Sequence, residues 1–160
     1  MPRLLLAAIG TIIGSLGCAP PATVSARLQA ALEHEAHGEV IRISDLTEFE
    51  WERFVALGPY TTREAAEAAL GFPWPEFERF GLSSSDSFSL LVFTKDGSVV
   101  HVEKHPRCKP DFGRGILQRP LAPEVAVISI KRDQHCAVAR AAAQQGAAAD
   151  GSSPGKADTV

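Results

Sequence analysis

The sequence predicts an α+β fold in which two helices pack on a mostly antiparallel three- to four-stranded sheet. Its predicted elements follow the order helix, strand, helix, hairpin, strand, without the regular alternation that builds a parallel sheet. The pair Asp96-Gly97 between two apolar runs indicates a tight antiparallel turn. The 160 residues are 45% hydrophobic and 22% charged, which suits one folded domain and excludes a wholly disordered or collagen-like chain.

Two segments carry apolar residues at helical spacing. The first covers residues 25–37, where Ser25 can cap the start. The second begins at Thr61, which forms a capping box with Glu64, and ends at Gly71. Alanines on the buried side of this second helix let it lie close to a sheet.

Four further segments predict strands. They are residues 39–43, residues 51–57, the hairpin of residues 88–104, and residues 124–131. The segment 51–57 is apolar on both faces and therefore predicts an interior strand, with Trp51, Val55 and Leu57 on one face. A two-residue turn fixes the hairpin register. It predicts a core face with Phe93 opposite Val100 and Leu91 opposite Val102, and a partly wet face with Val92 opposite His101 and Leu90 opposite Glu103.

The two ends of the chain differ in composition from its middle. Residues 1–17 are predicted to be a signal peptide, because Arg3 precedes an uncharged stretch shorter than the roughly 20 residues of a membrane-spanning helix. Residues 18–23 would be a linker and residues 24–136 a single α+β domain. Residues 137–160, rich in Ala, Gly and Ser, predict a disordered tail, with a short helix near its start as the alternative.

The segment Ser15-Leu16-Gly17-Cys18 places a small residue directly before a cysteine. Residues 1–18 thereby resemble the signal of bacterial lipoproteins, although Ser15 stands where that family usually has Leu. The resemblance implies that Cys18 becomes the lipidated N-terminus, with palmitate in its acyl chains, and anchors the protein to a membrane. Since Ala19 replaces the aspartate of an inner-membrane retention signal, it favours the outer membrane, facing the periplasm, in a Gram-negative cell. A secreted protein without lipid is the alternative.

Residues 41–103 resemble small uncharacterised bacterial lipoproteins, in which a Trp-acidic pair opens a strand that ends in Pro-Tyr-Thr at a helix cap. The matching residues here are Trp51-Glu52 and Pro59-Tyr60-Thr61, followed by the hairpin. A helix that ends at Leu70-Gly71 before a hairpin is more loosely similar to accessory lipoproteins of outer-membrane protein assembly, from which Pro59-Tyr60 departs. The first resemblance implies the fold and no activity.

Export would place the chain in an oxidising compartment. We therefore expect Cys108 and Cys136 to form a disulfide, with two unpaired buried cysteines as the alternative. Two candidate metal clusters, His34 with His37 and His101 with His105 and Cys108, lack any further motif that would complete them.

No catalytic residue and no cofactor follow from the sequence. The serines at 83–85 lack the spacing of a nucleophile elbow and predict a loop, and the alternating glutamates at 48–52 predict a solvated face. A formal net charge of −3 argues against nucleic acid as a partner.

The segment 72–82 gathers four aromatic residues, which either cover the core or face a partner. Trp74, Phe77 and Phe80 are the candidate partner-binding residues, and we expect at least one of them to be exposed. The favoured hypothesis is a non-catalytic envelope lipoprotein that binds or scaffolds another envelope component. The alternative is a periplasmic enzyme or enzyme inhibitor that acts through the loop 105–120.

Overall fold

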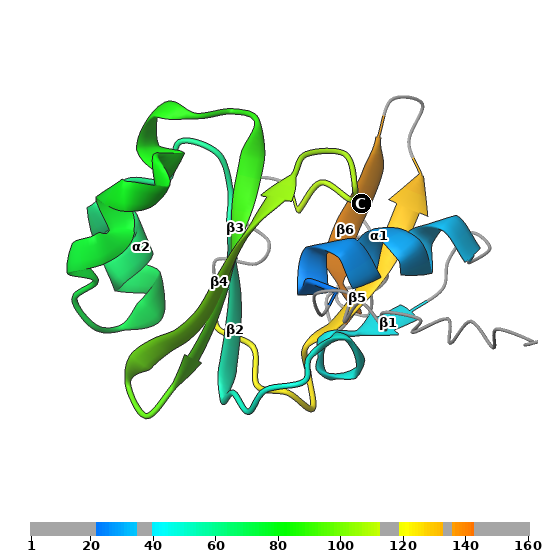
Figure 1. The fold of residues 1–160 in the computed structure, drawn as a ribbon, viewed down its shortest axis with the longest axis horizontal. Helices are drawn as coiled ribbons and strands as arrows, with labels where there is room; N and C mark the ends of the chain where they lie inside the picture. Colours follow the sequence, from blue (N-terminus) through cyan, green and yellow to red (C-terminus); the bar gives the residue numbers. More distant parts are fainter. Residues whose placement is uncertain (1–21, 35–39, 113–118, 133–135, 143–160) are drawn as a thin grey trace, which may run out of the picture.

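The structure is a computed structural model that describes residues 22–34, 40–112, 119–132 and 136–142 (Figure 1). Its α-helices in this part are α1 (Val24–His34) and α2 (Arg63–Leu70). Three 3-10 helices accompany them: η1 (Ile43–Leu46), η2 (Pro75–Phe80) and η3 (Leu82–Ser84). The strands are β1 (Val40–Arg42), β2 (Arg53–Leu57), β3 (Phe88–Lys95), β4 (Ser98–Pro106), β5 (Val127–Arg132) and β6 (Ala137–Ala141).

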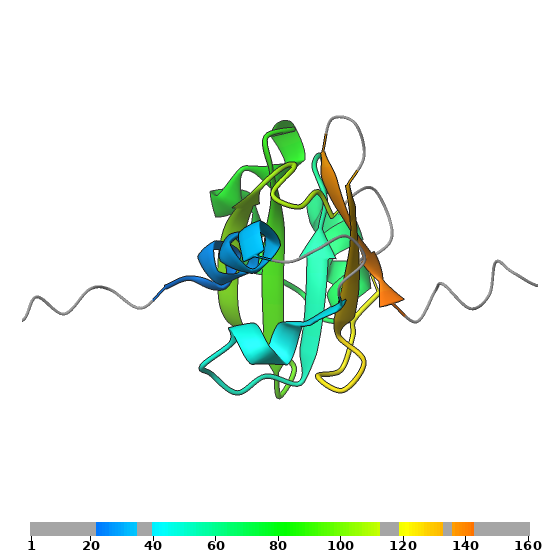
Figure 2. The same ribbon diagram turned by 90° about the vertical axis from the view of Figure 1, so that its right-hand side faces the viewer.

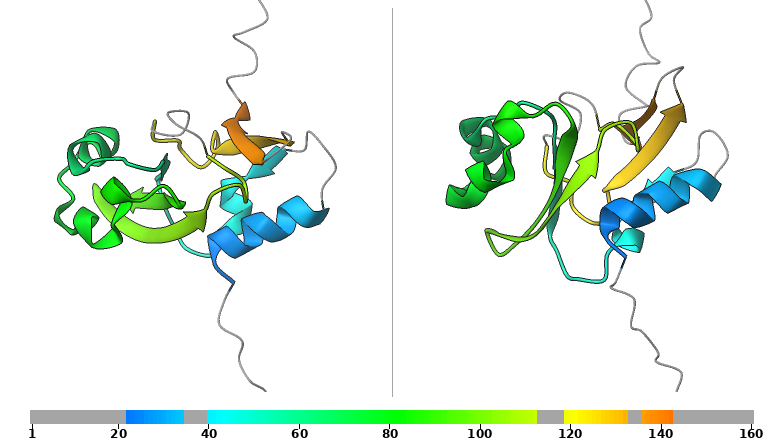
Figure 3. Two further views of the ribbon diagram at one scale, coloured as in Figure 1. Left: turned by 90° about the horizontal axis from the view of Figure 1, so that it is seen from above. Right: turned by 45° about the horizontal axis from the view of Figure 1, so that its top comes forward.

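The predicted α+β class and antiparallel pairing are confirmed, but the strands form two sheets instead of one. The order in the first is β2-β3-β4 and in the second β1-β5-β6. Seen from above, α2 and η2 lie on one side of the first sheet, and α1 lies with the second sheet on the other side (Figure 3). A quarter turn of the view brings α1 and β6 in front of the first sheet (Figure 2). The first sheet is thus the middle layer.

Strand β3 carries apolar side chains into both interlayer cores, and its residues from Ser89 to Thr94 are all buried. Leu91 and Phe93 face α1 and the second sheet, whereas Leu90 and Val92 face α2 and η2. The predicted strand around residues 51–57 is likewise buried on both faces. β2 is nevertheless an edge strand of its sheet, and among the described residues one isolated bridge, from Phe54 to Leu121, pairs with its outer side.

Three local predictions need correction. Ser25 does not cap α1, because the helix begins at Val24 and the hydroxyl of Thr23 accepts the N–H of Ala26 at 3.1 Å.

The other two concern β2 and α2. Trp51 lies on the side of Phe93, with ring centroids 5.4 Å apart, because β2 begins at Arg53 and alternation does not extend back to residue 51. The cap of α2 is Thr62, whose hydroxyl accepts the N–H of Ala65 at 3.3 Å. The neighbouring Thr61 instead donates its hydroxyl to Gly58 O at 2.6 Å.

The hairpin turn is confirmed, but the predicted register holds only as far as the pair Thr94 and Val99. Asp96 and Gly97 have φ of 51° and 67°, as a type I′ turn requires. A bulge then leaves Val100 as an extra residue, so Phe93 faces His101 instead of Val100. Each residue of β4 beyond the bulge therefore lies on the opposite face from the predicted one.

The predicted tail boundary at residue 137 is too early. Ala137–Ala141 forms strand β6 and pairs with β5 from Ile128 to Arg132, where a tail or a short helix was expected. Backbone bonds with Asp111 cover the outer side of β6. Cys108 and Cys136 are paired in a disulfide, with Cα atoms 4.6 Å apart, as predicted.

The predicted signal peptide, Cys18 and most of the predicted linker lie outside the described residues, as do His37 and residues 143–160. In the part of the chain that the structure describes, no helix is both long and apolar enough to cross a bilayer.

Candidate functional site

The aromatic segment is divided between core and surface. Trp74 and Phe77 are 4% and 0% exposed and belong to the core between the first sheet and α2. Phe80 is half-buried, with its ring centroid 5.3 Å from that of Trp74. Core covering is therefore the role of the first two residues, and of the three candidate partner-binding residues only Phe80 keeps part of its ring at the surface.

The conformation of this segment follows from its prolines and glycines. Helix α2 ends at Gly71, which has φ of 84°, and η2 starts with Pro75, whose missing N–H costs nothing at a helix start. The carboxylate of Glu67 accepts the N–H of Trp74 at 2.8 Å and thereby ties the segment back to α2. The aromatic residues are held on a rigid turn beside the hairpin.

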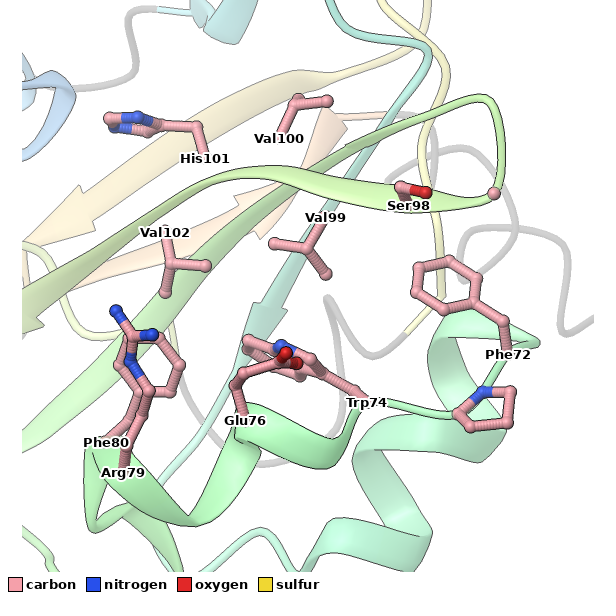
Figure 4. A pocket seen from close by; sticks show the side chains of 12 residues that line it. Phe72, Trp74, Glu76, Arg79, Phe80, Ser98, Val99, Val100, His101 and Val102 are labelled. Carbon is pink, nitrogen blue, oxygen red and sulfur yellow. The ribbon is translucent and has the colours of Figure 1, made fainter.

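A groove of about 570 Å³ lies between this segment and β4 (Figure 4). Phe72, Trp74 and Phe80 line one wall. The other wall is the start of β4, where Val99 and Val102 point toward the aromatic residues and Val100 and His101 point away from them. Its size is in the range of about 300–1,000 Å³ that is typical of ligand sites.

Two opposite charges, Glu76 and Arg79, stand on the wall of the groove. The guanidinium carbon of Arg79 lies 5.1 Å from the centroid of Phe80. Neither residue forms an ion pair with another described residue. The nearby ion pair joins two other side chains, Arg63 and Glu78. Both charges are therefore open to a ligand, while the aromatic wall offers apolar contact.

The opposite face of β4 holds the start of α1. The carboxylate of Glu103 accepts the N–H of Val24 at 3.0 Å and of Ser25 at 2.8 Å, and His101 Nε2 donates to it at 2.6 Å. Burial alone would raise the pKa of Glu103, but the hydrogen bonds from Ser25, His101 and Val24 outweigh it and lower the pKa. An anion at this end also complements the helix dipole.

Ser25 and His105 form the one serine–histidine contact among the described hydrogen bonds, at 2.8 Å. His105 Nε2 donates to Pro110 O at 3.0 Å, so Nδ1 accepts the Ser25 hydroxyl. Burial is the main cause that lowers the pKa of His105. Both residues are buried, at 5% and 1% exposed, and neither lines the groove. The contact therefore fastens α1 to β4 and presents no nucleophile to a substrate.

The other sequence candidates are not brought together as a site. His101 and His105 share a face of β4, as expected, but are held separately by Glu103 and by Ser25 with Pro110. Cys108 lies within ligand distance of Asp111 and Cys136, yet a disulfide offers no thiolate to a metal. The side chain of His34 lies outside the described residues, as do residues 113–118 of the candidate loop.

The sequence did not indicate the two side chains that hold α1 on β4. Glu103 and His105 are 78 to 80 residues from their helix partners, and no local signal links such distant positions. The strand wall of the groove depends on the bulge at Val100, which the turn residues do not predict.

Comparison with known proteins found no matching family model, curated protein or solved structure.

Proposed function

We propose that this chain is an exported, lipid-anchored and non-catalytic binding protein that holds another component of the cell envelope in the groove beside β4. The observation that carries the proposal is the groove itself, with an aromatic wall, a strand wall and two charges, Glu76 and Arg79, that form no ion pair within the described part of the chain. Such a combination suits recognition, because apolar contact supplies affinity and a few polar groups supply orientation.

A binding role agrees with the chemistry of the described residues. The groove brings together the carboxylate of Glu76, the guanidinium of Arg79, the hydroxyl of Ser98 and the imidazole of His101, which is already bonded to Glu103. The Ser25 and His105 pair lies on the other side of β4 and is committed to holding α1. Among the described residues Ser98 forms no hydrogen bond with His101, so the groove offers its polar groups as contacts for a bound partner and not as an activated nucleophile.

The disulfide supports the expected compartment. Cys108 and Cys136 would be reduced in a cytosol, whereas an oxidising envelope maintains such a bond. Residues 15–18 resemble the lipidation signal of bacterial lipoproteins. Together with the disulfide, this resemblance supports export and an anchor at Cys18 on the periplasmic side of the outer membrane. The membrane would then be one partner, contacted through the lipid.

Site-specific photocrosslinking in intact cells tests the binding proposal. A photoreactive amino acid replaces Val100, which is 46% exposed at the groove, or, as controls, Tyr60 or Val125, which are 51% and 52% exposed elsewhere. We expect a discrete adduct from position 100 and none of that size from the two controls. Absence of an adduct at position 100, or equal adducts at all three positions, would refute the proposal.

Fractionation of cells tests the anchor independently. The Cys18→Ser variant should leave the membrane fraction or accumulate as an unprocessed precursor, while Cys108→Ser should stay at the membrane. A mature wild-type chain that begins at a residue other than Cys18 and carries no lipid, shown by mass spectrometry, would exclude lipidation.

A further inference from the structure

Strand β4 is an edge of the first sheet, and its outer side has no strand partner among the described residues. The opposite edge is partly closed, because Phe54 donates its N–H to Leu121 O at 2.8 Å and accepts from Leu121 N at 2.9 Å. Unpaired backbone groups along an edge are a template for another strand. The open edge of this sheet is therefore β4.

The strand register shows which groups of β4 face outward. Since Phe54 directs both polar groups to Leu121, the pair Phe54 and Phe93 carries no ladder hydrogen bonds, and Phe93 turns its own groups toward β4. Alternation along the antiparallel pair then turns the N–H and C=O of Val102 and Lys104 away from β3. No other described group forms a hydrogen bond with the backbone N–H or C=O of these two residues.

The groove follows the same edge. Val99 and Val102 line it from one face of β4, and Val100 and His101 line it from beyond the bulge, on the other face (Figure 4). Side chains from both faces of a strand can line the same cavity if the cavity runs along the edge of that strand. The groove therefore follows the outer edge of β4. Edge hydrogen bonds and apolar contacts are thus available to the same occupant.

We propose that this groove binds an extended segment of a partner polypeptide, which adds a strand to the outer edge of β4. Its backbone would pair with Val102 and Lys104, and its side chains would alternate between the aromatic wall at Phe80 and the face of the sheet that carries α1. The segment would therefore be apolar at every second position. This inference rests on the proposed binding function and specifies the class of its partner.

The test uses the wild-type protein with a selected peptide. Linear cysteine-free dodecapeptides displayed on phage are selected on the folded chain, and the enriched peptide is synthesised together with two N-methylated isomers. One isomer is methylated at its odd residues and the other at its even residues. In a paired strand only alternate amides face β4, so one isomer should bind at least about tenfold more weakly and the other should bind nearly as well as the parent.

Hydrogen exchange and an edge variant give a second readout. Bound peptide should slow amide exchange at Val102 and Lys104 at least about tenfold. Val102→Pro removes an outward N–H without touching the ladder to β3, and should abolish binding, while Val102→Thr keeps the donor and should bind. Enrichment of no peptide, equal affinity of the two isomers, or unprotected amides would overturn the strand proposal.

The outcomes also separate this proposal from the broader one. An adduct at Val100 in cells together with equal isomers would leave the binding function standing and remove the added strand. If the protein alone dimerises and Val102→Pro makes it monomeric, the occupant is a second copy, which would also overturn the proposal of a partner segment. Failure of the Val100 crosslink would refute the binding function itself.

Discussion

Replacing Glu103 with Gln should loosen α1 from the sheet while keeping the shape of the side chain. The carboxylate, with 10% of the side chain exposed, accepts hydrogen bonds from the N–H groups of Val24 and Ser25 and from His101 Nε2. An amide leaves only one acceptor and turns an NH₂ group toward a remaining donor. Hydrogen bonds to a charged group contribute about 1.5–3 kcal/mol each, so we expect a loss of about 2–4 kcal/mol.

Thermal and urea unfolding at pH 7 measure this effect. At about 4 °C per kcal/mol for a domain of this size, the Tm should fall by about 8–16 °C. The matched control is Glu52→Gln, because Glu52 is exposed and accepts the N–H of Asp96 at 3.2 Å. The control should change stability by less than about 0.5 kcal/mol. Equal stability of Glu103→Gln and the wild type would show that α1 does not depend on this carboxylate.

The pH dependence gives the same experiment a second check. Because folding lowers the pKa of Glu103, its contribution is complete above the ordinary value of 4.5 and disappears as the pH falls through the folded value. The difference between wild type and Glu103→Gln should therefore shrink in that range. The lowered pKa of His105 also removes stability below its ordinary value of 6.5, and the charge of Glu103 opposes this lowering in the wild type but not in Glu103→Gln. The change in the difference is therefore measured below pH 4.5. A difference that stays constant down to pH 3 would contradict the reasoning.

Five other variants at four positions test the structure by chemical unfolding. Trp74→Ala should cost about 3–5 kcal/mol, since its ring is buried, whereas the half-buried Phe80→Ala should cost less than half of that and weaken binding at the groove. Cys108→Ser should cost about 3–4 kcal/mol, since the bond joins residues 28 apart in sequence, and reductant should lower the Tm of the wild type but not of the variant. Deletion of Val100 removes the extra residue and leaves Phe93 opposite His101, so the faces of β4 should be kept at a cost below about 3 kcal/mol, and Val100→Ala should cost less than about 1 kcal/mol.

Short-range chemistry made part of the fold predictable. The Asp96-Gly97 turn needs positive φ at both residues, and Gly71 ends α2 in the left-handed region, so both features can be identified from a few adjacent residues. The cap of α2 was off by one position because two adjacent threonines offer the same hydroxyl, and the contact of Thr61 with Gly58 decides between them.

Long-range contacts made the remainder unpredictable. Strand β6 is composed largely of Ala and Val and lacks a distinctive pattern, so its pairing with β5 and its cover by Asp111 decide its conformation. For the candidate site, the sequence identified the aromatic wall but not the strand wall. Whether an aromatic ring on a loop is core or surface depends on what stands opposite it, and that depends on the register of β4.

The bulge at Val100 connects the two functions of β4. If Val100 instead took a regular place in the ladder opposite Phe93, alternation from the turn would direct His101 and Glu103 to η2, and Glu103 would lose the N–H groups of Val24 and Ser25. With it, Glu103 reaches the first two N–H groups of α1, and Val99 and Val102 both face the groove. Within a few residues, β4 thus places the carboxylate that holds α1 on one face and the apolar wall of the groove on the other. Because the outer edge of the same strand stays open between them, the bulge also fixes which side chains would flank a strand added there.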